Sequence, residues 1–194
     1  MARFVALLRG INVGRHNRVA MADLRQLLTD LGHTGVRTHL NSGNAVFAGR
    51  ARSPAAVARA IEAELQARLG RAIRVFVRTG DELAAVVAAN PLPTTDPSRL
   101  LVVFLDGPPD AAALHRIDLD AYAPERLAAG RREVYLWLPS GITGSALLKA
   151  IGEQRVDAAG TARNWATVTR LLSLVEATSD GPPDGTDDAP ERRR

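Results

Sequence analysis

The residues best suited to chemistry in this chain form one polar segment, Arg9-Gly10-Ile11-Asn12-Val13-Gly14-Arg15-His16-Asn17-Arg18. This segment follows an apolar run, Phe4–Leu8, and precedes an amphipathic stretch that begins near Met21. Two glycines, two asparagines, three arginines and a histidine within one segment predict a loop at the carboxyl end of a strand, where such folds tend to bind ligands. Glycine-exposed amides beside arginine side chains favour an anion, because both donate hydrogen bonds toward negative charge.

Two remote segments carry further candidates for the same anion. Asn41-Ser42-Gly43-Asn44 separates two short apolar runs, and its residue types are those of a hairpin turn. Thr161–Thr167 opens the last amphipathic stretch, where we expect Thr161 or Asn164 to cap a helix and Arg163 to lie at the positive end of its dipole. A cation is unfavourable there, and a bound anion would relieve the conflict.

We therefore predict that these segments converge on one basic cleft between two halves of the molecule, which accepts a phosphate- or carboxylate-bearing ligand. The predicted ligand-binding residues are Arg9, Gly10, Asn12, Gly14, Arg15, Arg18, Ser42, Asn44, Arg163 and Asn164. Structural roles stay open for all of them: the glycines and asparagines serve tight turns, the loop arginines are solvated, and Arg163 pairs with a carboxylate. Gly10 and Gly14 lack the Gly-Lys-Ser/Thr sequence of a P-loop, so triphosphate binding by that motif is not predicted.

An enzyme that acts on a phosphorylated or acidic metabolite is the alternative. Its arginines would hold the negative charge of the substrate, and His16 or Asp23 would transfer protons. The sequence has no histidine or carboxylate spacing typical of metal ligands and no Gly-x-Ser-x-Gly motif. We therefore predict neither a metal nor another cofactor, and the sequence leaves open whether the protein is an enzyme.

Composition sets the class of protein. The 194 residues are 46% apolar, enough for a sizeable core, and they include no cysteine, which excludes disulfides and thiolate metal sites. No apolar run reaches the ~18 residues of a membrane span, and the first residues, Met1–Phe4, do not resemble a signal peptide. These features predict a cytoplasmic protein without a membrane partner, and they do not indicate its oligomeric state.

Positive charge is concentrated near the N-terminus. Residues 1–61 contain nine arginines and two acids, although the formal charge of the whole chain is only +4. This excess raises nucleic acid as an alternative partner. Only 4% of residues are aromatic, however, and the predicted strands lack the pattern of an RNA-recognition motif, so backbone-only binding is the form that stays open. A structural or partner-binding protein, whose loops only pack the halves together, is a third alternative.

Hydrophobic periodicity predicts a split β-α-β arrangement in residues 1–79. The expected order is strand, helix, strand, strand, helix, strand, over the ranges Phe4–Leu8, Met21–Leu31, Val36–Leu40, Ala45–Ala48, Ser53–Leu69 and Ile73–Val77. Ser53-Pro54 is a typical helix start, and Gly32 and Gly70 are placed to end the two helices.

Residues 80–178 repeat most of this pattern. We expect helices over Asp81–Ala89, Pro109–Ile117, Ser145–Ile151 and Trp165–Val175, with strands at Leu100–Leu105, Arg126–Ala128 and Val134–Leu138. The predicted fold class is α+β, with two ferredoxin-like halves in tandem repeat. Residues 179–194 hold Asp, Gly, Pro and terminal arginines without an apolar anchor, and we predict that they form a disordered tail.

The motifs also occur in the order of a known family. They are Arg9-Gly10-Ile11-Asn12-Val13-Gly14, Met21-x-x-Leu24, Asn41-Ser42-Gly43-Asn44-x-Val46-Phe47, Asn90-Pro91, Tyr135-Leu136-x-Leu138-Pro139-x-Gly141, Ser145-x-Leu147 and Thr161-x-Arg163-Asn164-Trp165-x-Thr167. From Phe4 to Val175 the chain resembles the bacterial family catalogued as domain of unknown function 1697. The resemblance implies an α+β fold of two ferredoxin-like halves and does not imply an activity. His33 and His39 stand where this family commonly has aromatic residues, which favours packing roles for both.

Overall fold

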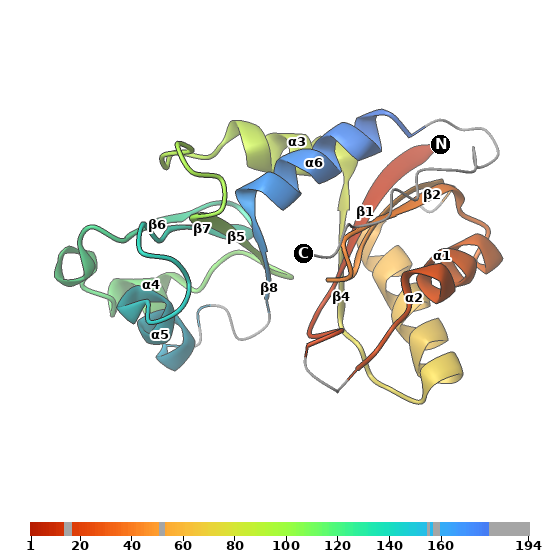
Figure 1. Cartoon of the computed structure of the whole chain (residues 1–194), viewed down its shortest axis with the longest axis horizontal. Helices are drawn as coiled ribbons and strands as arrows, with labels where there is room; N and C mark the ends of the chain where they lie inside the picture. The colour runs from red at the N-terminus through yellow and green to blue at the C-terminus, as the bar shows by residue number, and fades with distance from the viewer. Residues whose placement is uncertain (14–16, 51–52, 155, 157–159, 179–194) are drawn as a thin grey trace, which may run out of the picture.

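Figure 1 shows the computed structural model, which describes residues 1–13, 17–50, 53–154, 156 and 160–178. In these ranges the chain forms two four-stranded antiparallel sheets with helices against their faces. The predicted site residues Gly14, Arg15 and His16 and the predicted tail 179–194 lie outside the described residues.

The first half has the predicted β-α-β-β-α-β order. Its elements are β1 (Ala2–Leu8), α1 (Met21–Asp30), β2 (Thr34–His39), β3 (Asn44–Gly49), α2 (Pro54–Leu69) and β4 (Val75–Thr79). The strands lie in the order β2-β3-β1-β4, which is the ferredoxin-like topology. The predicted boundaries of α2 are confirmed: the Ser53 side chain accepts a hydrogen bond from the Ala56 N–H, and Gly70 ends the helix in the left-handed conformation.

The second half repeats this topology. Its elements are α3 (Gly80–Ala88), β5 (Leu100–Phe104), α4 (Ala111–His115), a short 3-10 helix (Leu119–Tyr122), β6 (Arg126–Ala129), β7 (Glu133–Trp137), α5 (Ala146–Glu153), β8 (Thr161–Asn164) and α6 (Trp165–Glu176). The strand order β6-β7-β5-β8 matches that of the first sheet element by element. The α+β class and the two ferredoxin-like halves are therefore confirmed.

The predicted start of the last helix at Trp165 and its cap at Asn164 are confirmed, but the strand before it was not predicted. Thr161–Asn164 forms strand β8, which pairs antiparallel with β5. The helix begins at Trp165, and Asn164 caps it by accepting a hydrogen bond from the Thr167 N–H at 2.9 Å. Arg163 therefore projects from an edge strand and not from the first turn of a helix.

Three apolar cores separate the layers of the molecule. Helices α1 and α2 cover one face of the first sheet, and α4 and α5 cover one face of the second. Helices α3 and α6 lie across both sheets, as Figure 1 shows, and share the central core with the remaining sheet faces. That core includes Val5, Val46 and Phe76 from the first sheet, Val102, Phe104 and Tyr135 from the second, and Leu83, Val168 and Leu171 from the two helices. Within the described ranges, no helix is long and apolar enough to cross a membrane.

Two histidines flank β2, His33 directly before the strand and His39 at its end, and we expected packing roles for both. His33 is buried, and the centre of its ring lies 4.4 Å from the centre of the Phe47 ring. His39 is half-buried on β2. Burial lowers the pKa of His33, and burial together with the nearby charge of Arg170 lowers the pKa of His39, both from an ordinary value of 6.5.

These two lowered pKa values predict a loss of stability in mild acid. A base whose pKa is lower in the folded protein binds fewer protons there than in the unfolded chain, so stability falls as pH falls below about 6.5. We expect the free energy of unfolding in urea to drop between about pH 7 and pH 5, and to drop less in the double variant His33→Gln/His39→Gln. An identical drop in both proteins would show that other groups cause it.

Candidate functional site

Asn12 fixes the predicted loop onto the neighbouring hairpin. It adopts a positive φ of 56°, and its side-chain Nδ2 donates to the carbonyl oxygens of Val19 at 2.9 Å and Asn41 at 2.6 Å. Its Oδ1 accepts a hydrogen bond from the Val19 N–H at 2.9 Å. The amide of Asn12 therefore has protein partners on both sides and positions the loop that carries Arg9 and Gly10.

The hairpin turn that holds Ser42 packs tightly against the end of β1. The Leu8 N–H donates to the Gly43 carbonyl at 2.8 Å, and a Cβ at Gly43 would lie 2.6 Å from Ile11 Cδ1. Asn44 is completely buried, and its Nδ2 donates to the His39 carbonyl at 2.8 Å and to Ser42 Oγ at 2.9 Å. Ser42 and Asn44 thus have the hairpin roles that were the structural alternative to ligand binding.

Arg163 brings the remote segments together, as the sequence predicted. Its Nε donates to Asn44 Oδ1, and its Nη2 donates to the carbonyl oxygens of Leu8 at 2.8 Å and Ser42 at 3.0 Å. Its Nη1 donates to Thr161 Oγ1 at 2.9 Å and to the Ala162 carbonyl at 2.8 Å. All five N–H groups of the guanidinium are therefore used inside the protein. Burial lowers the pKa of Arg163 to about 10.

Arg78 occupies the equivalent position in the first half. Each of the two arginines directly precedes the capping residue of a central helix, Thr79 for α3 and Asn164 for α6. Arg78 Nη2 donates to the carbonyl oxygens of Leu105 at 2.6 Å and Arg132 at 3.1 Å, both in the second half. Each half therefore contributes one buried arginine that binds backbone carbonyls of the other half.

The acceptors of the two arginines also correspond. Leu8 ends β1 and donates its N–H to the Gly43 carbonyl, and Leu105 follows β5 and donates its N–H to the Arg132 carbonyl at 2.9 Å. Asn44 and Glu133 begin β3 and β7, and both are buried. The tandem repeat thus extends to individual hydrogen bonds at the contact between the halves.

The two arginines differ in how many donors they use. Arg78 makes three hydrogen bonds, from Nη1 to the Val77 carbonyl at 3.1 Å and from Nη2 to the two carbonyls of the second half. Its Nε–H and its second Nη1–H have no acceptor among the described residues. Arg78 is only 2% exposed, and burial, with the nearby positive charge of Arg132, lowers its pKa to about 10. A buried guanidinium with unused donors is costly unless a ligand or water meets them.

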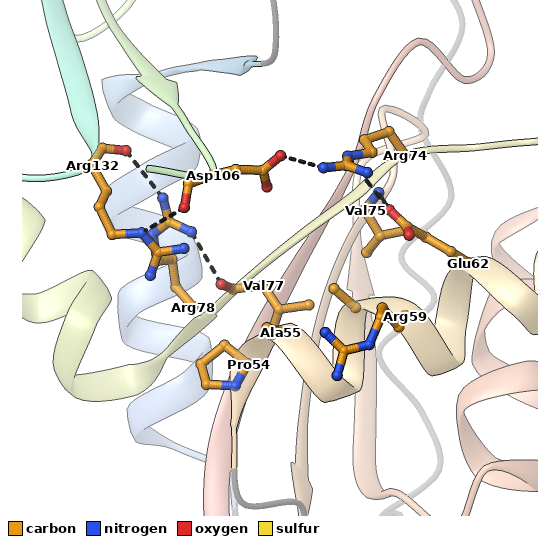
Figure 2. Close-up of a pocket in the computed structure, with 11 residues that line it drawn as sticks. Pro54, Ala55, Arg59, Glu62, Arg74, Val75, Val77, Arg78, Asp106 and Arg132 are labelled. Atoms are coloured by element: carbon orange, nitrogen blue, oxygen red, sulfur yellow. Dashed lines mark hydrogen bonds and ion pairs between the residues drawn. The ribbon is translucent and has the colours of Figure 1, made fainter. Parts of the chain in front are cut away.

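Arg78 lines a cleft of about 310 Å³ between the halves, which Figure 2 shows. The cleft lies between α2, strand β4 and the second half. Its lining residues are Pro54, Ala55, Ala58, Arg59 and Glu62 of α2, Arg74, Val75, Val77 and Arg78 in or next to β4, and Asp106 and Arg132 of the second half. Four arginines and two acids give the lining an excess of positive charge.

The acids of this cleft are already engaged with one of the arginines. Arg74 donates from Nη2 to Asp106, and its Nε lies 3.7 Å from Glu62 Oε1. The hydrogen bond to Asp106 and the charges of both acids raise the pKa of Arg74. Arg59 is exposed and forms no hydrogen bond or ion pair with any described residue, and Figure 2 shows its guanidinium at the opposite side of the cleft from Asp106. Arg132 is itself paired with Glu82, whose Oε1 lies 3.4 Å from Arg132 Nη1. The charge without a described acidic partner therefore comes from Arg59 and Arg78.

The predicted ligand residues do not line this cleft. The described ones lie instead at the equivalent contact between the halves, around Arg163, or in the loop beside it. They are Arg9, Gly10, Asn12, Arg18, Ser42, Asn44, Arg163 and Asn164. The sequence did not predict the four arginines of the cleft, because they come from three separate segments: α2 (Arg59), β4 and the residue before it (Arg74 and Arg78), and the β6–β7 turn (Arg132). The one available signal is that Arg78 and Arg163 each stand directly before a helix cap.

Asp23, one of the two residues proposed for catalysis, is separate from the cleft. It is exposed on α1 and lines a second, mainly apolar hollow of about 200 Å³ between α1 and α2, with Leu27, Leu65 and Leu69. The other, His16, lies outside the described residues. In the part of the chain that the structure describes, no three or more His, Asp or Glu side chains are grouped to hold a metal ion.

The architecture defines an α+β protein of two tandem ferredoxin-like halves, with helices α3 and α6 lying across both sheets. The family model described as protein of unknown function (DUF1697) matches residues 1–135, and the chain belongs to this family. A solved structure, the conserved bacterial protein SP0830 from Streptococcus pneumoniae, is similar with a TM-score of 0.71 and 24% sequence identity, over 90% of this chain and 98% of that chain. At this identity the likeness shows the fold alone. A search of curated proteins found no match.

The turn at Gly43 predicts a stability effect that separates packing from backbone strain. Gly43 and Gly144 have nearly equal φ values of 79° and 81°, but only Gly43 has atoms where a Cβ would lie. We expect Gly144→Ala to cost roughly 1 kcal/mol for the backbone alone, and Gly43→Ala to cost about 2 kcal/mol more because Ile11 and Leu8 must move. Urea unfolding measures both, and equal losses would contradict the tight contact.

The saturated guanidinium predicts that Arg163 cannot be replaced by lysine. An ammonium has three donors, so Arg163→Lys leaves at least two of the present acceptors unpaired and should lower the free energy of unfolding by about 2 kcal/mol or more. Arg78→Lys is the matched control, because Arg78 makes three hydrogen bonds. Urea unfolding should show the smaller loss for Arg78→Lys, and the reverse order would refute the donor count.

Proposed function

We propose that this protein binds a phosphate- or carboxylate-bearing ligand in the cleft between its halves. The observation that carries the proposal is the buried guanidinium of Arg78, which lines the cleft with two N–H groups that no described residue accepts. An anion would satisfy these donors with charge-assisted hydrogen bonds, which are about twice as strong as neutral ones.

Two other features of the cleft support an anion. Arg59 lines the cleft and has no partner among the described residues, so its charge is available to a ligand. Helix α2 begins at the cleft, with Pro54 and Ala55 in the lining. The positive end of its dipole adds to the attraction for negative charge.

The loop site predicted from the sequence is retained as a second position for the same class of ligand. Arg9, Gly10 and Arg18 are exposed on it, and Asn12 holds its backbone in place. Ser42 and Asn164 lie at its margin, on the two segments that Arg163 joins. Arg163 itself would have to exchange a backbone carbonyl for the ligand, so we place the ligand first at Arg78.

Binding is favoured over catalysis and over nucleic-acid recognition. The alternative of an enzyme acting on a phosphorylated or acidic metabolite relied on Asp23, which lies in another hollow, and on His16, which is outside the described residues. Five sheet aromatics are fully buried, and the sixth, Trp137 of β7, is half-buried against the central core; the five are Phe4, Phe47, Phe76, Phe104 and Tyr135. Helices cover these faces, so bases cannot stack there as they do on an RNA-recognition motif. We place the protein in the cytoplasm, in keeping with its lack of cysteine.

The proposal predicts stabilisation by phosphate. At a concentration ten times its dissociation constant, a ligand that binds only the folded protein should add about 1.4 kcal/mol to the free energy of unfolding and raise Tm by a few degrees. Arg59→Ala should weaken phosphate binding about tenfold, because it removes a charge-assisted partner. Thermal unfolding in phosphate and in chloride of equal ionic strength measures the shift.

Arg126→Ala is the control for loss of positive charge. Arg126 is exposed on the edge strand β6, away from the cleft. Its substitution by alanine removes the same positive charge as Arg59→Ala. We expect its phosphate response to equal that of the unchanged protein. A response lost equally in both variants, or kept in both, would refute binding at this cleft.

A further inference from the structure

Strand β4 presents one open backbone donor to the cleft. The Arg9 N–H donates to the Arg74 carbonyl, and the alternation of an antiparallel ladder then turns the N–H and C=O groups of Val75, Val77 and Thr79 away from β1. The Val75 N–H donates to Glu62 Oε1 at 2.9 Å, and the Thr79 N–H donates to Glu82 Oε2 at 2.9 Å. The Val77 carbonyl accepts from Arg78, so the Val77 N–H is left without a described acceptor.

This edge is suited to a compact anionic group and not to a peptide strand. An added strand needs a run of free donors and acceptors along the edge. Here the side chains of Glu62, Arg78 and Glu82 occupy the positions on either side of the Val77 N–H. The remaining donor lies beside the two unused N–H groups of Arg78, and both residues line the cleft.

The number of donors favours phosphate over carboxylate. The Val77 N–H, two N–H groups of Arg78 and the guanidinium of Arg59 together offer more donors than the two oxygens of a carboxylate require for orientation. A phosphate monoester has three terminal oxygens and up to two negative charges near neutral pH, which match the donors and the uncompensated arginines.

The side of the cleft around Arg74 favours a ligand that also donates hydrogen bonds. Figure 2 shows Glu62 and Asp106 on either side of Arg74. Arg74 is paired with Glu62 Oε1 and with Asp106 Oδ2, so Glu62 Oε2 and Asp106 Oδ1 have no partner among the described residues. Free carboxylate oxygens accept hydrogen bonds, and hydroxyl groups on a ligand would supply them.

The cleft also limits the size of the ligand. Its volume of about 310 Å³ is at the lower end of the ~300–1,000 Å³ typical of small-molecule sites. We infer that the cleft takes a small phosphate monoester that carries hydroxyl groups, with its phosphate at Arg59, Arg78 and the Val77 N–H and its hydroxyls at Glu62 and Asp106. This inference rests on the proposed function and names the ligand class of the same site.

Calorimetry of the full chain with three probes tests the ligand class. Glycerol 3-phosphate should bind at least about tenfold more tightly than methyl phosphate, because it has the same charged group and adds two hydroxyls. Glycerol without phosphate should not bind measurably. Equal affinities for the two phosphates would overturn the hydroxyl inference and leave the proposed function standing, whereas no binding of either phosphate would overturn both.

Glu62→Gln tests where the hydroxyls bind. The glutamine oxygen still accepts from the Val75 N–H, so the fold is kept, but a negative charge leaves the cleft. Affinity for methyl phosphate should therefore rise, while the preference for glycerol 3-phosphate should fall to less than about threefold. Glu153→Gln, an exposed change on α5, should alter neither value. An undiminished preference in Glu62→Gln would overturn the placement of the hydroxyls.

Discussion

Two buried arginines hold this molecule together by a simple constraint: a guanidinium removed from water must donate its N–H groups to something. Arg163 finds carbonyl oxygens at the end of β1 and in the β2–β3 turn, and Arg78 finds them after β5 and in the β6–β7 turn. Because each arginine belongs to one half and its acceptors to the other, both edge strands are fixed beside the opposite half. The cleft exists because β4 is held in this way next to Arg132 and Asp106.

The two halves differ in the residue that stands near the guanidinium of each buried arginine. Arg163 meets the neutral amide of Asn44 and uses every donor, whereas Glu133 stands at the matching position near Arg78 and binds the backbone N–H groups of Arg131 and Arg132. Glu133 thereby closes the β6–β7 turn and leaves Arg78 with free donors. One contact between the halves is thus saturated, and the other retains capacity for a ligand.

The elements of the fold were predictable because their signals are local. The Ser53-Pro54 start and the Gly70 end of α2 are in the sequence, and the apolar periods of β1 and α1 are long enough to recognise. Strand β8 was missed because its four residues alternate too briefly to distinguish a strand from a helix start. The meeting of Arg163 with the Ser42 turn was predictable from residue types, but its saturation was not, since a donor count requires coordinates. The cleft was missed for a related reason, because only the tandem topology brings Arg59 of α2 and Arg132 of the second half to the same cleft.

The described lining of the cleft is made mainly of side chains with fixed charge and of small or apolar side chains. The described residues of the lining include four arginines, two carboxylates, a proline and small or aliphatic side chains, and they include no histidine, serine, tyrosine or lysine. Both carboxylates contact Arg74. Arginine stays protonated, so what the lining offers a ligand is fixed charge and fixed donors. Fixed charge and fixed donors are what the proposed anion would need, because charge-assisted hydrogen bonds depend on both.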